Sequence, residues 1–274
     1  MNKLTRVFCC LALFACGNSN QKTVIVPAQT KQGTVDADSI LAKVNVDSTL
    51  MNTFAVQFDS VNTLVRDNKI DKVQAIKKLQ NIFPELQTAY DRLKPNEAKK
   101  DKWIFPVEGY SSKAIGGTRG EGYIPTGYNY FEGNKHGGHA AQDIFIYDKN
   151  QDCKDDKTGK FVNVRSVTNG IVVALEQDWD SASLLRGGKY IFIYNPCDNA
   201  LFYYAHNNEV FVNVGQILNA GDTIATIGRT GLNAFKKKSP THLHFMKLKL
   251  DKDFYPKPVN TYQDLLKAET NYKQ

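Results

Sequence analysis

Apolar residues near the start of the chain recur every three or four positions in two runs, over residues 51–65 and 73–93. This spacing predicts two amphipathic helices. The polar residues 66–69 between the runs predict a turn, so we expect an antiparallel helical hairpin. Asp47 or Ser48 and Asp71 are expected to cap the two helices, and Pro84 is expected to kink or restart the second one.

Beyond residue 140 the pattern changes to short apolar runs that Gly, Asn and Pro interrupt. Such runs predict an antiparallel, mainly β domain. Gly215, Gly221 and Gly228 lie where tight turns would need a residue that tolerates a positive φ. A short helical pattern follows at residues 262–268. The expected strands cover residues 143–147, 162–167, 170–175, 189–194, 201–204, 210–212, 223–227 and 241–248.

A Gly-rich segment with little periodicity, residues 109–138, lies between the predicted hairpin and the predicted strands. It contains Tyr110, Tyr123, Tyr128 and Tyr130. This composition is typical of a long loop over a substrate groove.

Residues 1–15 have the layout of a secretory signal peptide. Lys3 and Arg6 precede an apolar run over residues 7–15, which is too short to span a bilayer. Residues 13–17, Leu-Phe-Ala-Cys-Gly, look like a lipobox, where a bacterial signal peptidase cleaves before a cysteine that becomes lipid-modified. Cys16 would then anchor an exported protein to a lipid bilayer of the cell envelope, facing the periplasm or the cell surface. The alternative is ordinary signal cleavage without lipidation.

These patterns divide the chain into five parts. Polar residues after Cys16 predict a disordered tether, and the charged residues 94–101 are expected to separate the hairpin from the β domain. The parts are a signal peptide (1–15), a lipidated tether (16–46), a helical accessory region (47–100), a β domain (101–252) and a C-terminal extension with a short helix (253–274).

Composition narrows the range of partners. The formal net charge is +7, but basic and acidic residues are mostly interspersed, so we interpret the charge as a solvated surface. No nucleic-acid motif is recognisable, and export argues against nucleic acid as a partner. Cys153 and Cys197 lie in polar loops of an exported chain, which allows a disulfide without requiring one.

The candidate chemistry is concentrated in the histidines, of which the chain has five. His242 and His244 alternate along an expected strand, so they project from one face, where one can bind a metal ion while the other faces the metal-bound water. Asp143 opens another expected strand, and His139 lies shortly before it. His139, Asp143 and His244 would make a three-ligand site with one open position, the arrangement of catalytic zinc.

These motifs occur in order with Tyr203-Tyr204-Ala205-His206 and with the spaced glycines that follow. In this combination, residues 103–249 resemble the lysostaphin-type, LytM-like zinc endopeptidases that cut peptidoglycan cross-links. The resemblance implies antiparallel β-sheets of the duplicated hybrid motif type around a groove, one Zn²⁺ ion, and peptidoglycan stem peptides as the substrate. It also implies that His242 is the base, that His206 orients water or steadies the oxyanion, and that a tyrosine, for which Tyr128 and Tyr130 are candidates, donates to that oxyanion.

The expected function is therefore a zinc metalloendopeptidase that hydrolyses peptide cross-links in the bacterial cell envelope. For a lipoprotein of a two-membrane bacterium, a D,D cross-bridge is favoured over a glycine-rich bridge. The alternative is a non-hydrolytic wall-binding scaffold or activator of other hydrolases, although such relatives usually lack metal ligands. The rhythm of residues 212–222 also resembles lipoyl-like barrels, which do not need the His and Asp set. A further possibility is that the helical hairpin covers the groove and inhibits the enzyme.

Two features stay outside this interpretation. Lys236, Lys237 and Lys238 shortly precede His242, and they could meet substrate carboxylates or form a solvated turn. His136 matches nothing in the motif, so we expect an exposed loop residue.

Overall fold

The computed structural model describes residues 37–94 and 102–270. The expected signal peptide, Cys16 and the part of the tether before residue 37 lie outside the described residues. So do residues 95–101 of the expected boundary before the β domain. Within the described residues, no helix is both long enough and apolar enough to cross a membrane.

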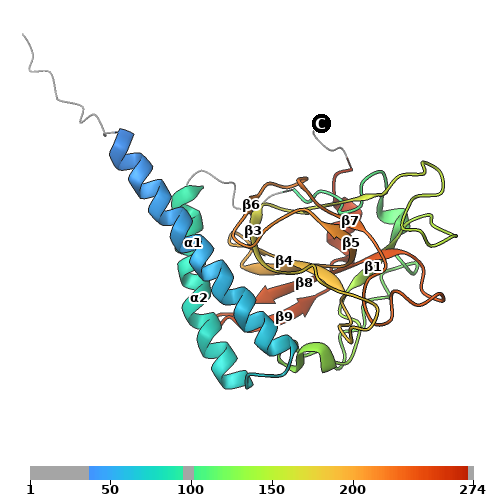
Figure 1. Ribbon diagram of the computed structural model, residues 1–274, viewed down its shortest axis with the longest axis horizontal. Helices are drawn as coiled ribbons and strands as arrows, with labels where there is room; N and C mark the ends of the chain where they lie inside the picture. Colours follow the sequence, from blue (N-terminus) through green and yellow to red (C-terminus); the bar gives the residue numbers. More distant parts are fainter. Residues whose placement is uncertain (1–36, 95–101, 271–274) are drawn as a thin grey trace, which may run out of the picture.

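Two long helices form the predicted hairpin (Figure 1). They are α1 (Ala37–Arg66) and α2 (Lys72–Leu93). α1 begins well before Asp47, so the expected cap at Asp47 is wrong, and residues 37–46 of the expected tether are helical. In this first part of α1, Leu41, Val44 and Val46 are exposed, so they form no one-sided stripe that predicts a helix. Asp47 lies inside α1, where its Oδ1 accepts a hydrogen bond from Nη1 of Arg92 at 3.1 Å.

Asp71 caps α2 as predicted, because its Oδ1 accepts a hydrogen bond from the backbone N–H of Gln74 at 2.9 Å. Pro84 lies inside α2, which continues to Leu93, so the expected restart of the helix is wrong. Pro84 is exposed, and water can bind the backbone carbonyl that a proline leaves without a donor. The packed face of α2 holds the helix together across this position.

The rest of the chain forms the predicted antiparallel, mainly β unit. Six strands follow the order β1-β8-β5-β4-β3-β6, while β7 pairs with β5 and β2, and β9 pairs with β8. The strands are β1 (Gln142–Phe145), β2 (Asn163–Arg165), β3 (Gly170–Glu176), β4 (Lys189–Asn195), β5 (Ala200–Val210), β6 (Ile217–Leu218), β7 (Thr223–Ile227), β8 (His242–Leu250) and β9 (Pro256–Val259). The short helices are η1 (Ser112–Ala114) and η2 (Tyr130–Lys135) in the Gly-rich segment and α3 (Tyr262–Lys267) at the predicted place.

The sequence pattern does not predict β6 and β9. β9 contains Pro256 and Pro258 and pairs with β8 at the edge of the sheet, where prolines are tolerated although they cannot donate to the ladder. Gly215 and Gly221 have the predicted positive φ, of 86° and 90°. Gly228 does not, and glycine is needed there for another reason, since a Cβ would lie 2.4 Å from the backbone nitrogen of Asn208.

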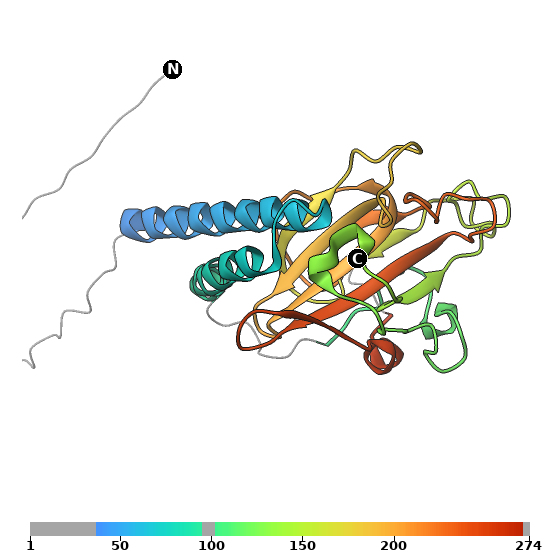
Figure 2. The same cartoon turned by 90° about the horizontal axis from the view of Figure 1, so that it is seen from below.

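The two faces of the sheet have different coverings. One face packs into a core that includes Tyr204 and Phe245. On the other face, α1 and α2 lie along one side of the sheet (Figures 1 and 2) and share a single apolar cluster with it, in which the ring of Phe83 lies 4.8 Å from that of Tyr194. The hairpin and the β unit therefore share one hydrophobic core on this face of the sheet.

Polar contacts fix the end of α1 against the same face. Asn62 is buried; its side chain donates a hydrogen bond to Oη of Tyr190 at 3.1 Å and accepts one from Oη of Tyr130 at 3.0 Å. Arg66, in the last turn, pairs with Glu176 at 2.8 Å. Buried polar groups that find their partners favour one arrangement over the alternatives, so α1 docks in a defined position.

Candidate metal centre

The pairing of β1 with β8 positions the first two residues of the site. Asp143 lies opposite His244 in the antiparallel ladder, and side chains in such a pair lie next to each other on one face. Oδ1 of Asp143 is 3.1 Å from Nδ1 of His244. Two segments that are 101 residues apart thus converge.

His139 joins them from the loop before β1. Its backbone forms two hydrogen bonds with Ile124, of 2.6 and 2.7 Å, which hold this loop. Nδ1 of His139 is 2.7 Å from the carbonyl oxygen of Gly122. Because a carbonyl can only accept, Nδ1 carries the proton, and Nε2 keeps its lone pair. Nε2 is 3.2 Å from Oδ1 of Asp143.

The three side chains fit a zinc ion. Their ligand atoms lie within 4.8 Å of one another, and two imidazole nitrogens with one carboxylate oxygen are a donor set that zinc accepts. Ligand atoms bound at the usual distances to a tetrahedral zinc ion lie about 3.3 Å apart. The two nitrogen–oxygen separations, of 3.1 and 3.2 Å, agree with that spacing.

A β-bulge turns His206 towards the same place. The register between β4 and β5 shifts between Lys189 and Ile191, and His206 has a φ of 67°, which is uncommon for a residue other than glycine. Its backbone N–H donates to the carbonyl of Gly187 at 2.9 Å. Bulges of this kind redirect side chains next to functional sites.

The rings of His206 and His242 are oriented in the same way as that of His139. Nδ1 of His206 lies 2.8 Å from the carbonyl oxygen of Thr230, and Nδ1 of His242 lies 2.7 Å from that of Pro240. In each ring, Nε2 is therefore left as an acceptor. The two ring centroids are 4.9 Å apart, and Nε2 of His242 is 3.8 Å from Oδ1 of Asp143. Two imidazoles with an available Nε2 thus stand beside the three candidate ligands.

Burial and hydrogen bonding move the pKa values of this cluster in different directions. Burial raises the pKa of Asp143, but its close contacts with His139 and His244, whose rings donate to Oδ1 when they are protonated, outweigh burial and hold this pKa far below its usual value. The hydrogen bond to Asp143 raises the pKa of His139. Burial lowers the pKa of His244, and it lowers the pKa of His206 well below its usual value. At neutral pH, Asp143 is therefore ionised and His206 is neutral, as metal binding and proton acceptance require.

All five residues singled out by the sequence line one cavity of about 250 Å³. They are His139, Asp143, His206, His242 and His244. The hairpin does not cover this cluster, because the side chains of the three candidate ligands keep exposed fractions of 33, 25 and 20%. That the hairpin covers the groove and inhibits the enzyme stays a prediction.

Other side chains also line the cavity, among them His136, Arg186 and Tyr203, to which the sequence motif assigns no role there. The expectation that His136 is an exposed loop residue is wrong, since it is partly buried and its ring lies 4.7 Å from that of Tyr128. The pair Gly187-Gly188 after Arg186 is the sequence signal that could have pointed here. A Cβ at Gly187 would lie 1.9 Å from Oη of Tyr203.

Neither candidate oxyanion tyrosine lines this cavity. The hydroxyl of Tyr130 is buried and donates to Asn62, and the ring of Tyr128 packs on His136. Tyr203 does line it. Tyr203 is therefore a better candidate than Tyr128 or Tyr130 for the tyrosine that donates to the oxyanion.

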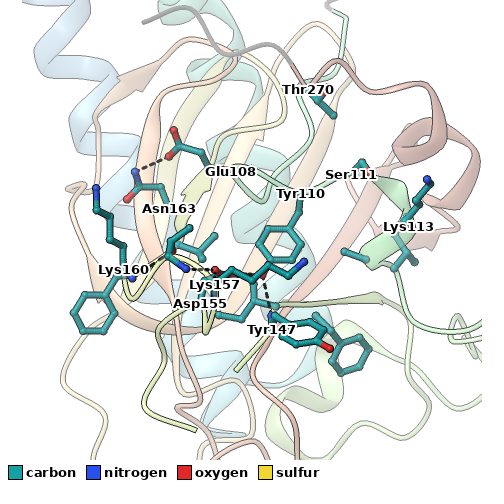
Figure 3. A pocket seen from close by; sticks show the side chains of 18 residues that line it. Glu108, Tyr110, Ser111, Lys113, Tyr147, Asp155, Lys157, Lys160, Asn163 and Thr270 are labelled. Carbon is teal, nitrogen blue, oxygen red and sulfur yellow. Dashed lines mark hydrogen bonds between the residues drawn. The ribbon is translucent and has the colours of Figure 1, made fainter. Parts of the chain in front are cut away.

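A larger cleft, of about 1150 Å³, lies elsewhere. Residues 108–115, residues 155–163 and the end of β1 contribute to its lining, and Figure 3 shows Lys113 and Lys160 on opposite sides of it. No histidine lines it. Because a functional site needs converging titratable groups as well as space, the smaller cavity is the better candidate.

The remaining open features lie away from the cluster. Cys153 and Cys197 form no disulfide with each other. Lys236, Lys237 and Lys238 are exposed, and none of them lines the cavity. This segment is therefore a solvated turn.

Comparisons with known proteins give one family and several solved structures. The family model described as Peptidase family M23 matches residues 154–256. A comparison with curated proteins finds no match. Among solved structures, the chain is similar to a protein of Ruminococcus gnavus described as a glycyl-glycine endopeptidase lytM, with 22% identity over 81% of this chain and 87% of that one and a TM-score of 0.43.

Two other solved structures are also similar. One is the catalytic domain of lysostaphin from Staphylococcus simulans, with 21% identity over 46% of this chain and 79% of that one and a TM-score of 0.32. The other is a zinc containing peptidase from Vibrio cholerae, with 19% identity over 63% of this chain and 41% of that one and a TM-score of 0.38.

Proposed function

Residues 154–256 belong to peptidase family M23, and from this premise we propose that the protein is a zinc metalloendopeptidase that hydrolyses peptide cross-links of peptidoglycan. One observation carries the proposal. The ligand atoms of His139, Asp143 and His244 converge with a spacing that fits zinc, and His206 and His242 stand beside them. A scaffold that only binds the wall would need neither this donor set nor the two additional imidazoles.

Nε2 of His139, Oδ1 of Asp143 and Nδ1 of His244 would hold the ion. The chemistry that zinc supplies in such a site is polarisation of the scissile carbonyl and activation of water near neutral pH. The carbonyl of Gly122 supports this arrangement, because its hydrogen bond to Nδ1 of His139 fixes which ring nitrogen faces the ion.

His242 is the proposed general base. Its Nδ1 is committed to the carbonyl of Pro240, so Nε2 would accept the proton of the attacking water and later donate it to the leaving amine. His206 is held neutral by burial. Its Nε2 would orient the water or, once protonated, steady the oxyanion.

The protein purified without its signal peptide and without Cys16 (residues 17–274, here called the mature protein) and loaded with zinc tests this function on cross-linked peptidoglycan. We expect release of muropeptides that have lost their cross-links. His242→Ala should lower the rate by about 10²- to 10⁴-fold and leave the zinc content unchanged. Lys237→Ala, which changes an exposed lysine outside the cavity, should keep full activity.

The same experiment separates the alternatives. Wild-type protein that binds wall material but releases no product would support the non-hydrolytic scaffold. If His242→Ala loses zinc and loses activity only for that reason, the roles assigned to His242 and His244 would have to be exchanged.

We also propose that the enzyme works outside the cytoplasm, anchored to the envelope by a lipid on Cys16. The support is the order of basic residues, apolar run and lipobox in residues 1–17. In cells, Cys16→Ala should move the protein from the membrane fraction to the soluble fraction, and mass spectrometry should find an acylated N-terminal cysteine in the wild type. A wild-type protein with an unmodified Cys16 would contradict this.

A further inference from the structure

A second cavity, of about 110 Å³, lies beside the candidate metal centre. It shares several lining residues with the first cavity, so the two are neighbouring compartments of one cleft. The shared residues are His136, His139, Arg186, Gly187, Tyr203 and His244. A substrate held at the metal centre would therefore reach the second compartment directly.

The last turn of α1 bounds this compartment. Asn62, Val65 and Arg66 line it. Gly133 of η2 approaches this turn so closely that a Cβ would lie 2.2 Å from the carbonyl oxygen of Val65. Asn62 is held from both sides by tyrosine hydroxyls, so the wall is fixed. The hairpin therefore forms the wall of the compartment on this side.

The compartment has room for one residue. A water-sized group needs about 10–15 Å³, so a cavity of about 110 Å³ holds on the order of ten non-hydrogen atoms. This is the size of one side chain with its flanking atoms, and a longer segment would not fit. Most of its other walls are apolar or aromatic. They include Tyr128, Tyr130, Tyr190, Phe192, Tyr203 and Met246.

Arg186 places a positive charge where the two compartments meet. Arg66 is neutralised by Asp67 and Glu176, each at 2.8 Å, but no described carboxylate lies within 4.0 Å of the guanidinium of Arg186. Nη1 of Arg186 donates to the carbonyl oxygen of His136 at 2.5 Å, which fixes the side chain and uses one of its five N–H donors. A guanidinium with unused donors is suited to bind a carboxylate through two parallel hydrogen bonds.

We propose that this compartment is a substrate subsite that receives one residue with a free carboxylate, which Arg186 binds. The proposal rests on the proposed peptidase function and makes it more specific. The preferred substrate is a stem peptide in which a residue next to the scissile bond carries a free carboxylate. The hairpin, as the end wall of the subsite, is then a specificity element.

Pairs of synthetic stem-peptide dimers that differ only in this carboxylate, free or amidated, test the role of Arg186. For the zinc-loaded mature protein, kcat/KM should be on the order of ten- to a hundredfold higher with the free carboxylate, the range of a hydrogen-bonded charge. Arg186→Gln should bring this ratio close to one. Arg186→Lys should restore part of it, because lysine keeps the charge but not the fork.

A matched control comes from the same part of the chain. Lys189→Gln removes a neighbouring cation that lines neither compartment, and it should keep the wild-type ratio. Because each ratio compares two substrates of one enzyme preparation, partial loss of folded protein does not change it.

Val65→Ala tests the part played by the hairpin. Val65 is buried and lines the compartment. In a pair of stem-peptide dimers that carry either leucine or alanine at the residue placed in the compartment, shortening Val65 should raise kcat/KM for the leucine dimer several-fold relative to the alanine dimer. Val61→Ala is the control, since Val61 is also buried in α1 but does not line the compartment. An unchanged preference in Val65→Ala would overturn the role of the hairpin.

The outcomes distinguish failure of the proposed subsite from failure of the proposed peptidase function. Equal hydrolysis of the free and amidated substrates, unaffected by Arg186→Gln, would overturn the subsite and leave the peptidase function intact. If the protein hydrolyses neither these dimers nor intact peptidoglycan, the proposed function fails and the subsite fails with it.

Discussion

Strand β8 carries two different surfaces on one face of the sheet. Near its start, His242 and His244 border a cavity, whereas further along Met246, Leu248 and Leu250 are buried in the cluster that the sheet shares with the hairpin. Alternation along a strand puts all five side chains on the same face. The backbone of β8 therefore directs the side chains at its two ends in the same way.

What differs is the element that covers each end. Beyond His244, α1 and α2 supply apolar side chains such as Phe83 that exclude water. Around the histidines, part of the lining comes from loops, which leave space and polar atoms; the loop residues are Arg186, Gly187, Asn233, Ala234 and Ser239. One face of one strand thus gives a packed core at one end and a candidate reaction site at the other, and the last turn of α1 lies where they meet.

Removing the hairpin should have the largest effect, because it uncovers the packed end of this face of β8. Residues 102–274 alone would expose the apolar end of the face, and an exposed patch of this kind favours unfolding or aggregation. We expect circular dichroism to show a cooperative thermal transition for the mature protein and none for this fragment. A fragment that melts sharply and still binds zinc would show that the two ends of β8 are independent.

Phe83→Ala should have the next largest effect. Phe83 is fully buried, and its ring packs on those of Tyr194 and Phe254, so its loss should lower the free energy of unfolding by about 3–5 kcal/mol. Urea denaturation measures this. Val73→Ala changes a residue of the same helix that is 77% exposed, and it should stay within about 0.5 kcal/mol of the wild type.

Arg66→Met should have a smaller effect on stability. The paired side chains of Arg66 and Glu176 are mostly buried, with 20 and 17% exposed, so we expect a loss of about 1–3 kcal/mol, between exposed and buried ion pairs. The comparison is Lys102→Met, which removes a pair with Glu269 whose side chains are 84 and 46% exposed. Urea denaturation measures both variants. Equal losses in the free energy of unfolding would mean that the ion pair of Arg66 stabilises the protein no more than an exposed pair does.

The smallest expected effect concerns His206, whose ring should not titrate near neutral pH. Burial lowers the pKa of His206, so its ring proton resonances should not move between pH 8 and pH 6 in NMR spectra, with His206→Asn used for assignment. The unfolded chain binds a proton near pH 6.5 and the folded chain does not, so this residue makes the protein less stable as the pH falls below that value. A titration midpoint near pH 6.5 in the folded protein would contradict the buried, neutral ring.

Much of the fold and the cluster could be predicted because both depend on local signals. Alternation marks β8, and residue spacing marks the hairpin. The start of α1 could not be predicted, because Leu41, Val44 and Val46 are exposed and leave no stripe. β9 was hidden by its prolines, which only an edge position tolerates.

The rest of the site depends on contacts that no local pattern encodes. Arg186 enters the cleft because its side chain binds the carbonyl of His136, and Tyr203 lies against Gly187. Neither contact has a period or a motif. The failure of Tyr130 as an oxyanion candidate has the same origin, since its hydroxyl is taken by Asn62 from the hairpin.

The central claim is that three side chains from two distant segments hold one zinc ion. Atomic emission analysis of the dialysed mature protein measures this directly, alongside the variants His244→Ala and His242→Ala. We predict one zinc ion per chain in the wild type and in His242→Ala, and none in His244→Ala. A wild type that acquires no zinc, or a His244→Ala variant that retains it, would contradict the account.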